Sequence, residues 1–89
     1  MPYVPLESRV RMEPVLFPLL EEIDGNPKTP GDLNYMITSM IKEYVDGNLS
    51  YHTLNDVIGV LENVKLEFVR RVVVPYENDA IKRNGDVYK

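Results

Sequence analysis

The chain has 89 residues and a net charge of −4, with 44% hydrophobic and 27% charged residues. This length allows one domain, and the composition is typical of a globular protein rather than a disordered segment. The absence of cysteine excludes a disulfide framework, a thiolate nucleophile and an iron–sulfur cluster. No apolar run reaches the roughly 18 residues that a membrane span needs, and the N-terminus lacks a signal-peptide pattern, so we expect a cytoplasmic protein.

The charges are distributed unevenly along the chain. Residues 1–49 carry eight acidic and four basic side chains, whereas residues 50–89 carry six of each. Binding to a phosphate backbone requires a positive surface, so we expect no nucleic-acid partner. The lack of a long apolar run predicts no membrane partner. A local basic cluster could still bind a single anion.

Proline dominates the first part of the chain. Pro2 and Pro5 predict an extended arm over residues 1–9, which either frays or packs on a neighbouring subunit. A short helix follows within residues 10–24. Because an internal proline removes a helical hydrogen bond, this helix begins either at Pro14, with a bend, or at Pro18. The residues that come next, Asp24-Gly25-Asn26-Pro27, are typical of a turn.

The second helix has clear signals at both ends. Thr29, Pro30 and Asp32 have the spacing of a capping box with proline at the first helical position. Gly47 and Asn48 tolerate a left-handed conformation and therefore predict the end of this helix.

A third helix, the longest, is predicted from about Ser50 to Val74. Its cap is either Ser50 or Thr53. Its apolar side chains alternate in steps of three and four residues, at Leu54, Val57, Leu61, Val64 and Phe68. We expect a bend at Pro75, a further short helix over residues 76–83, and a polar tail over residues 84–89.

These patterns together predict an all-α fold and a single domain over residues 1–89. A helical hairpin, formed by the second helix and the long C-terminal helix, would carry a short N-terminal helix. The long helix is longer than the second one, so its apolar side chains beyond the end of the second helix need either the first helix or another chain as partner. A chain this small often completes its core with a second copy, so we expect a homo-oligomer.

The start of the second helix is a candidate ligand site. Free backbone donors at a helix start can bind an anion, and Asn34 and Tyr35 would orient a ligand there beside Asp32. The alternative is that Asp32 simply caps the helix and occupies those donors itself.

The long helix carries a second group of candidates. Asn55 and Glu62 lie seven residues apart on one face, and could look into a cleft between helices or subunits. The alternative for them is a solvated face. Gly59 costs about 1 kcal/mol relative to alanine inside a helix, so we expect another helix, or a ligand, to approach it closely.

Basic residues are concentrated only near the C-terminus, at Arg70, Arg71, Lys82 and Arg83. If the last helix folds back at Pro75, Arg70 and Arg71 would meet the other pair and form an anion site. The alternative is charge balance against the neighbouring acidic side chains.

Catalysis has little support in the sequence. His52 is the only histidine and has no evident relay partner, so a Ser–His arrangement is not visible and we expect no cofactor and no metal. Magnesium-dependent all-α nucleotide pyrophosphatases use paired carboxylates on facing helices. The nearest match here, Glu43 with Asp46, lies at a helix end.

Four stretches resemble a family of short uncharacterised proteins found in tailed phages and prokaryotic genomes. They are Gly31-Asp32-Leu33-Asn34-Tyr35, the stretch from Asn55 to Glu62, Arg70-Arg71-Val72-Val73 with Pro75-Tyr76-Glu77, and Asn84-Gly85-Asp86-Val87-Tyr88. The resemblance covers most of the chain and implies no activity and no catalytic residue. It implies a phage-associated context, and therefore a place in the host cytoplasm.

Three hypotheses for the function follow. The first is a non-enzymatic, homo-oligomeric, phage-type binding protein that acts on host physiology or defence by protein contact. The second is a sponge that holds a nucleotide second messenger between subunits, through Asn34, Tyr35, Asn55 and one of the two arginines Arg70 and Arg71. A magnesium-dependent nucleotide pyrophosphatase is a distant third.

Overall fold

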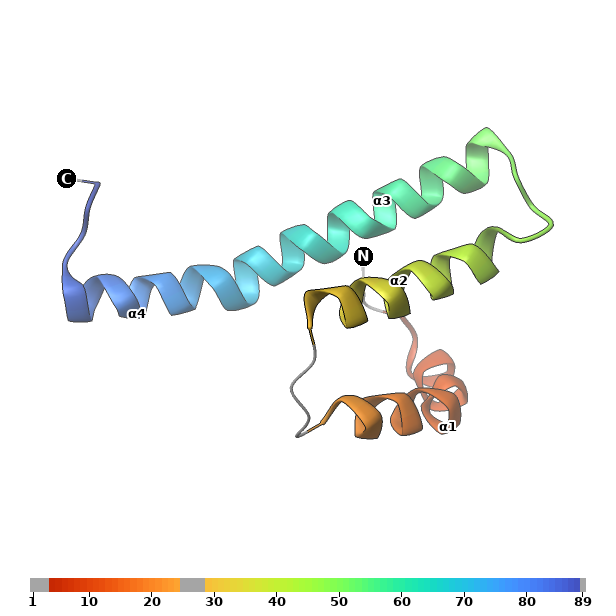
Figure 1. Cartoon of the computed structure of the whole chain (residues 1–89), viewed down its shortest axis with the longest axis horizontal. Helices are drawn as coiled ribbons and strands as arrows, with labels where there is room; N and C mark the ends of the chain where they lie inside the picture. The colour runs from red at the N-terminus through yellow and green to blue at the C-terminus, as the bar shows by residue number, and fades with distance from the viewer. Residues whose placement is uncertain (1–3, 25–28, 89) are drawn as a thin grey trace. The chain divides into compact units, whose positions relative to one another are not determined.

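The computed structural model describes residues 4–24 and 29–88, and this part of the chain is helical and contains no strand. The elements are three α-helices, a π-helical turn and a last α-helix (Figure 1). The all-α fold with a long C-terminal helix is therefore confirmed. Backbone contacts divide the chain into two units, and the boundary falls inside the third helix, after Asn55. The hairpin, the single domain and the homo-oligomer remain predictions.

The first helix, α1 (Leu6–Ile23), is longer than the sequence suggested. It begins before either predicted start and runs through both Pro14 and Pro18, so the predicted starts at these prolines are wrong. The extended arm is also wrong for residues 6–9, while residues 1–3 lie outside the described residues. Each internal proline removes one hydrogen bond, at a cost of about 3 kcal/mol, but does not by itself end a helix. The residues just before Pro14 are mostly strong helix formers.

The second helix, α2 (Pro30–Val45), has the predicted ends. The Asp32 backbone N–H donates to Thr29 Oγ1 at 3.1 Å, and the Thr29 N–H donates to Asp32 Oδ2 at 3.3 Å, which completes the capping box. After the helix, Gly47 has a φ of +73°, a conformation that favours glycine. The turn predicted from Asp24 to Pro27 lies largely outside the described residues.

The third helix, α3 (Tyr51–Phe68), is capped by Ser50. The Thr53 N–H donates to Ser50 Oγ at 3.2 Å, and the Ser50 hydroxyl donates to Thr53 Oγ1 at 3.1 Å. Of the two predicted caps, Ser50 is therefore the one used. Thr53 lies inside the first turn of α3, and its side chain is the hydrogen-bond partner of the cap.

The long helix does not stop before Pro75. A π-helical turn, η1 (Val69–Val73), follows α3 directly and continues into α4 (Val74–Asn84). The Val74 N–H bonds to the carbonyl of Val69, five residues back, as in a π-helix. In a regular α-helix the Pro75 ring would meet the carbonyl of Arg71, and a wider turn relieves that clash. The valine run at residues 72–74 is helical, as predicted.

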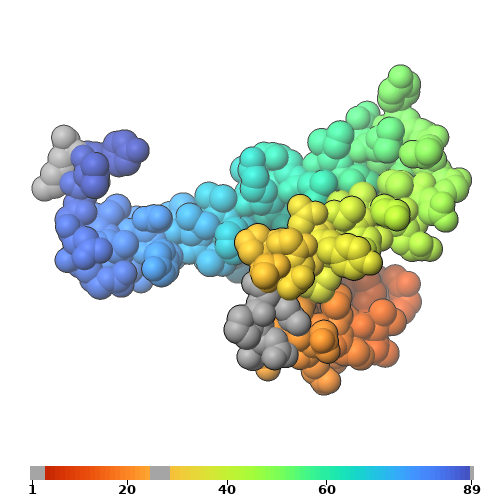
Figure 2. All heavy atoms as spheres, in the orientation of Figure 1, coloured from red at the N-terminus to blue at the C-terminus, as the bar shows by residue number. Residues whose placement is uncertain are grey.

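Hardly any side chain is shielded from solvent. In the described ranges no hydrophobic side chain is buried, and Thr53, 4% exposed, is the only buried residue. Large apolar side chains stand exposed on every α-helix, including Val15 on α1, Tyr35 on α2, Ile58 on α3 and Tyr76 on α4. The atoms of α4 form a layer one helix thick (Figure 2). Isolated helices of this length are only marginally stable in water. Another surface that covered these exposed apolar faces would therefore stabilise the helices.

Gly59 offers a test of what approaches α3. An added Cβ would meet nothing within 4 Å, so the close packing predicted there is absent from the structure. We expect Gly59→Ala to raise the free energy of unfolding by about 0.5–1 kcal/mol, because alanine is the better helix former. Urea unfolding followed by circular dichroism measures this change.

Gly47→Ala is the matched control. Gly47 has equally open space around it but a φ of +73°, so the same added methyl group should lower stability by about 1 kcal/mol. Loss of stability in Gly59→Ala would instead show that another chain or a ligand packs against Gly59 in solution.

Candidate functional site

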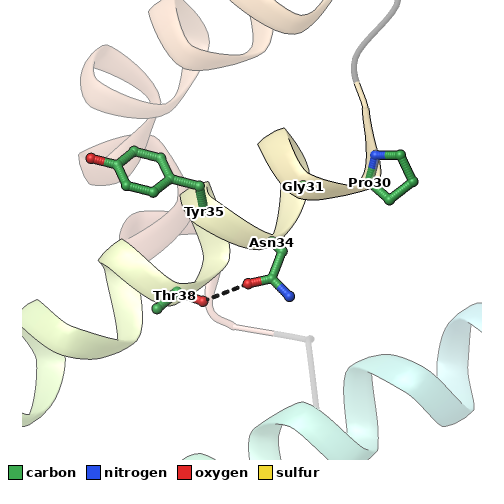
Figure 3. Close-up of a pocket in the computed structure, with 5 residues that line it drawn as sticks. All are labelled: Pro30, Gly31, Asn34, Tyr35 and Thr38. Carbon is green, nitrogen blue, oxygen red and sulfur yellow. Dashed lines mark hydrogen bonds between the residues drawn. The ribbon is translucent and has the colours of Figure 1, made fainter.

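The first turns of α2 form a small open hollow. Pro30, Gly31, Asn34, Tyr35 and Thr38 line it, at the three- and four-residue intervals that place side chains on one side of a helix (Figure 3). Two of the predicted ligand residues, Asn34 and Tyr35, are therefore brought together. Pro30, Gly31 and Thr38 were missed as lining residues, although Thr38 lies one helical turn beyond Asn34 and its spacing could have revealed it.

Asn34 and Thr38 are bonded to each other across one turn of α2. The Thr38 hydroxyl donates to Asn34 Oδ1 at 2.9 Å, which fixes the orientation of the amide. The amide nitrogen points away from this bond, and the Tyr35 ring points away from both side chains (Figure 3). With 74% of its surface exposed, Tyr35 can stack on a planar group, and the Asn34 amide can donate hydrogen bonds. Because the ring and the amide point apart, they would contact different parts of a ligand.

Asp32 serves the helix rather than the hollow. Its carboxylate accepts from the Thr29 N–H, and its own N–H is bonded to the Thr29 side chain. A negatively charged group already stands at the N-terminus of α2, where a bound anion would have to lie. The geometry thus matches the capping alternative for Asp32, and a ligand contact by this residue stays a prediction.

The other candidates lie on the long helix and in different units. Asn55 is the last residue of one unit, whereas Glu62, Arg70 and Arg71 belong to the other. The Glu62 carboxylate is 3.2 Å from Lys65 Nζ, and both side chains are more than half exposed. This pair fits a solvated helix face, where it stabilises by a few tenths of a kcal/mol. The cleft predicted for Asn55 and Glu62 remains a prediction.

Glu67 holds the two arginines. Arg70 Nη2 donates to Glu67 Oε1 at 2.7 Å, and Arg71 Nε lies 3.9 Å from the same oxygen. Arg70 is thus the closer partner, although residues three and four positions apart can both pair on a helix. Since one carboxylate faces both cations, the arrangement resembles charge balance more than a vacant anion site. A joint site with Lys82 and Arg83 stays a prediction.

In residues 4–24 and 29–88, no group of three or more acidic, histidine or cysteine side chains is placed to hold a metal ion. Over the same ranges, no helix is both long and apolar enough to cross a membrane. The described chain presents helices with exposed apolar faces and a small open hollow at the start of α2.

Comparison with known families supports one part of the resemblance seen in the sequence, namely membership of an uncharacterised family. The model of the family described as a domain of unknown function (DUF6899) matches residues 1–87, so the chain belongs to this family. No curated protein and no solved structure matches the chain.

Proposed function

We propose that this chain is a non-enzymatic, homo-oligomeric binding protein that acts by contact with another protein. The observation that supports this most directly is the exposure of its apolar side chains. Nearly half of the sequence is hydrophobic, yet no described hydrophobic side chain is buried. Ordering a chain costs about 1–2 kcal/mol per residue in backbone entropy, and burial of apolar surface is what offsets this cost. Association with other chains supplies that burial.

The partner beyond the oligomer is a host protein in this proposal, because the sequence resembles phage-type proteins. Exposed aromatic side chains support the same reading. Tyr35, Tyr44, Tyr51, Tyr76 and Tyr88 are all at least 65% exposed. Tyrosine joins an apolar ring to a polar hydroxyl, and it is enriched at protein interfaces for this reason. A small protein that displays five such side chains is well suited to recognise another protein surface.

Self-association gives the first prediction from this proposal. The 10.3 kDa chain should have a mass of at least two protomers at about 50 μM, measured by light scattering, and its thermal midpoint should rise with protein concentration. Concentration dependence arises because only the assembled form buries the apolar faces. A monomer with a concentration-independent midpoint would contradict the homo-oligomer.

Host contact gives the second prediction. Tagged protein expressed in a bacterial host should retain one host protein in stoichiometric amount, and the two purified proteins should form a complex again when mixed. Tyr44→Ser, on α2, and Tyr51→Ser, at the start of α3, each remove one exposed tyrosine ring and test whether it contacts the host protein. Recovery of no stoichiometric partner from any tested host would count against protein contact.

A second candidate function rests on the hollow at the start of α2. Asn34 and Tyr35 line it together, and these are two of the residues expected to hold a nucleotide second messenger. A nucleobase can stack on an aromatic ring and bond to an amide, and these are the two kinds of contact that Tyr35 and Asn34 offer. In this alternative the protein is a sponge, and Asn55 with Arg70 or Arg71 would complete the site between subunits.

A thermal-shift screen with cyclic and linear nucleotides separates the sponge from the binding protein. A sponge should gain several degrees with one nucleotide at about 100 times its Kd, equivalent to about 2.7 kcal/mol. Asn34→Ala should abolish the shift, whereas Asn63→Ala, on α3, should leave it intact. If no nucleotide shifts the midpoint, the sponge is excluded and the protein-contact proposal is unaffected.

A further inference from the structure

The unit that begins at Asp56 carries one apolar stripe along its whole helical length. Steps of three or four residues join its members, which we call the apolar seam: Val57, Leu61, Val64, Phe68, Val72, Tyr76 and Ala80. From Leu61 to Tyr76 these side chains are 42–65% exposed. The seam crosses from α3 through η1 into α4.

The π-helical turn is what keeps this seam straight. Repeated steps of four residues drift by about 40° each on a regular α-helix of 3.6 residues per turn. A π-turn contains about one residue more than an α-turn, so it turns all later residues back by roughly 90–100°. Because η1 lies between Phe68 and Val74, this backward rotation falls at the start of the three successive steps of four that lead from Phe68 to Ala80. Phe68, Val72, Tyr76 and Ala80 therefore stay on the side of the helix that bears Leu61 and Val64.

The helix that carries the apolar seam is acidic in its first half and basic in its second half. From Asp56 to Val69 the helix carries Asp56, Glu62, Glu67 and one cation, Lys65, for a net charge of −2. From Arg70 to Asn84 it carries Arg70, Arg71, Lys82 and Arg83 against Glu77 and Asp79, for a net charge of +2. Two copies side by side in the same direction would place like charge against like. Two copies in opposite directions place each acidic half against a basic half.

We infer that the apolar seam binds the same seam of a second copy of this chain, with the two helices antiparallel and Phe68 near the twofold axis. This inference rests on the proposed homo-oligomer and identifies the surface through which it forms. Residues equidistant from the axis then face each other, so Val57 meets Ala80 of the second copy and Leu61 meets its Tyr76. The occupant is a second copy because the charge pattern of the helix is complementary to its own reverse.

Leucine substitutions test the position of the interface. Leu61→Ala should weaken dimerisation at least about tenfold, as expected for a buried interface side chain, measured by analytical ultracentrifugation. Leu66 is the matched control, because it lies on the same helix, about 140° round from Leu61, and is similarly exposed. Leu66→Ala should change the dissociation constant less than about twofold. Circular dichroism of both variants verifies that they remain helical.

Cysteine crosslinking tests the direction of the helices. The chain contains no cysteine, so single Val57→Cys and Ala80→Cys variants each carry one thiol. A short bismaleimide should join the two variants when they are mixed, and neither variant to itself. In the antiparallel pair the like positions lie about 35 Å apart, since 23 residues separate them at 1.5 Å each. Crosslinking of each variant to itself would overturn the antiparallel arrangement.

The outcomes separate this inference from the proposed function. An oligomer that Leu61→Ala leaves intact would overturn the seam interface and leave the homo-oligomer standing. A wild-type chain that is monomeric at every concentration would overturn both.

Discussion

The stability of this protein depends on which surface packs against its apolar side chains. A helix of 16 to 18 residues gains little from its own hydrogen bonds in water, and its stability comes mainly from the face that it packs against another surface. Here α2 and α3 have side-chain caps, yet every large apolar side chain described remains at least partly open to solvent. Local structure is thus well specified while the apolar faces stay exposed. The proposed oligomer would bury these faces, and the proposed binding protein would use them to contact its partner.

Proline affects helix geometry differently in the two units. In α1, Pro14 and Pro18 lie one turn apart, and the helix continues through both with its α-helical geometry. Near the C-terminus a single proline at position 75 is accompanied by a change of helix type just before it. Valine at residues 72–74 adds β-branched crowding to the same stretch. The second arrangement alters the phase of everything that follows, and this change aligns the apolar residues of α4 with those of α3.

The parts of the structure that could be predicted are those that short-range chemistry decides. The capping box at Thr29 and Asp32, the end of α2 at Gly47 and the helical character of residues 72–74 all follow from the preferences of a few neighbouring residues. The start of α1 was missed, because an internal proline removes only one hydrogen bond and helix-forming neighbours can continue the helix through it. The π-turn was missed for a similar reason: it is a compromise between a ring clash and a continuous helix, and no residue type marks it.

The candidate site was predictable to a smaller degree. Helical spacing correctly groups Asn34 with Tyr35, and the same spacing explains Thr38 once the helix start is known. Contacts between long side chains are harder to predict, because a change of rotamer alone lets Glu67 reach either Arg70 or Arg71. Asp32 illustrates a general ambiguity. The residue that caps a helix and the residue that would assist a ligand at its N-terminus are of the same type, and only the bonded partners tell them apart.

The π-turn η1 also bears on how the length of this helix can change between relatives. Adding or removing one residue in an α-helix turns everything beyond it by about 100°, which would move the C-terminal half of an apolar stripe to the wrong side. A π-turn can absorb such a change, because it can revert to an α-turn when one residue is lost. Between α3 and α4, residues 69–73 are therefore the place where a single-residue deletion should keep the later residues in phase, and relatives that lack a residue there should also lack the proline, whose ring would clash with a regular α-turn.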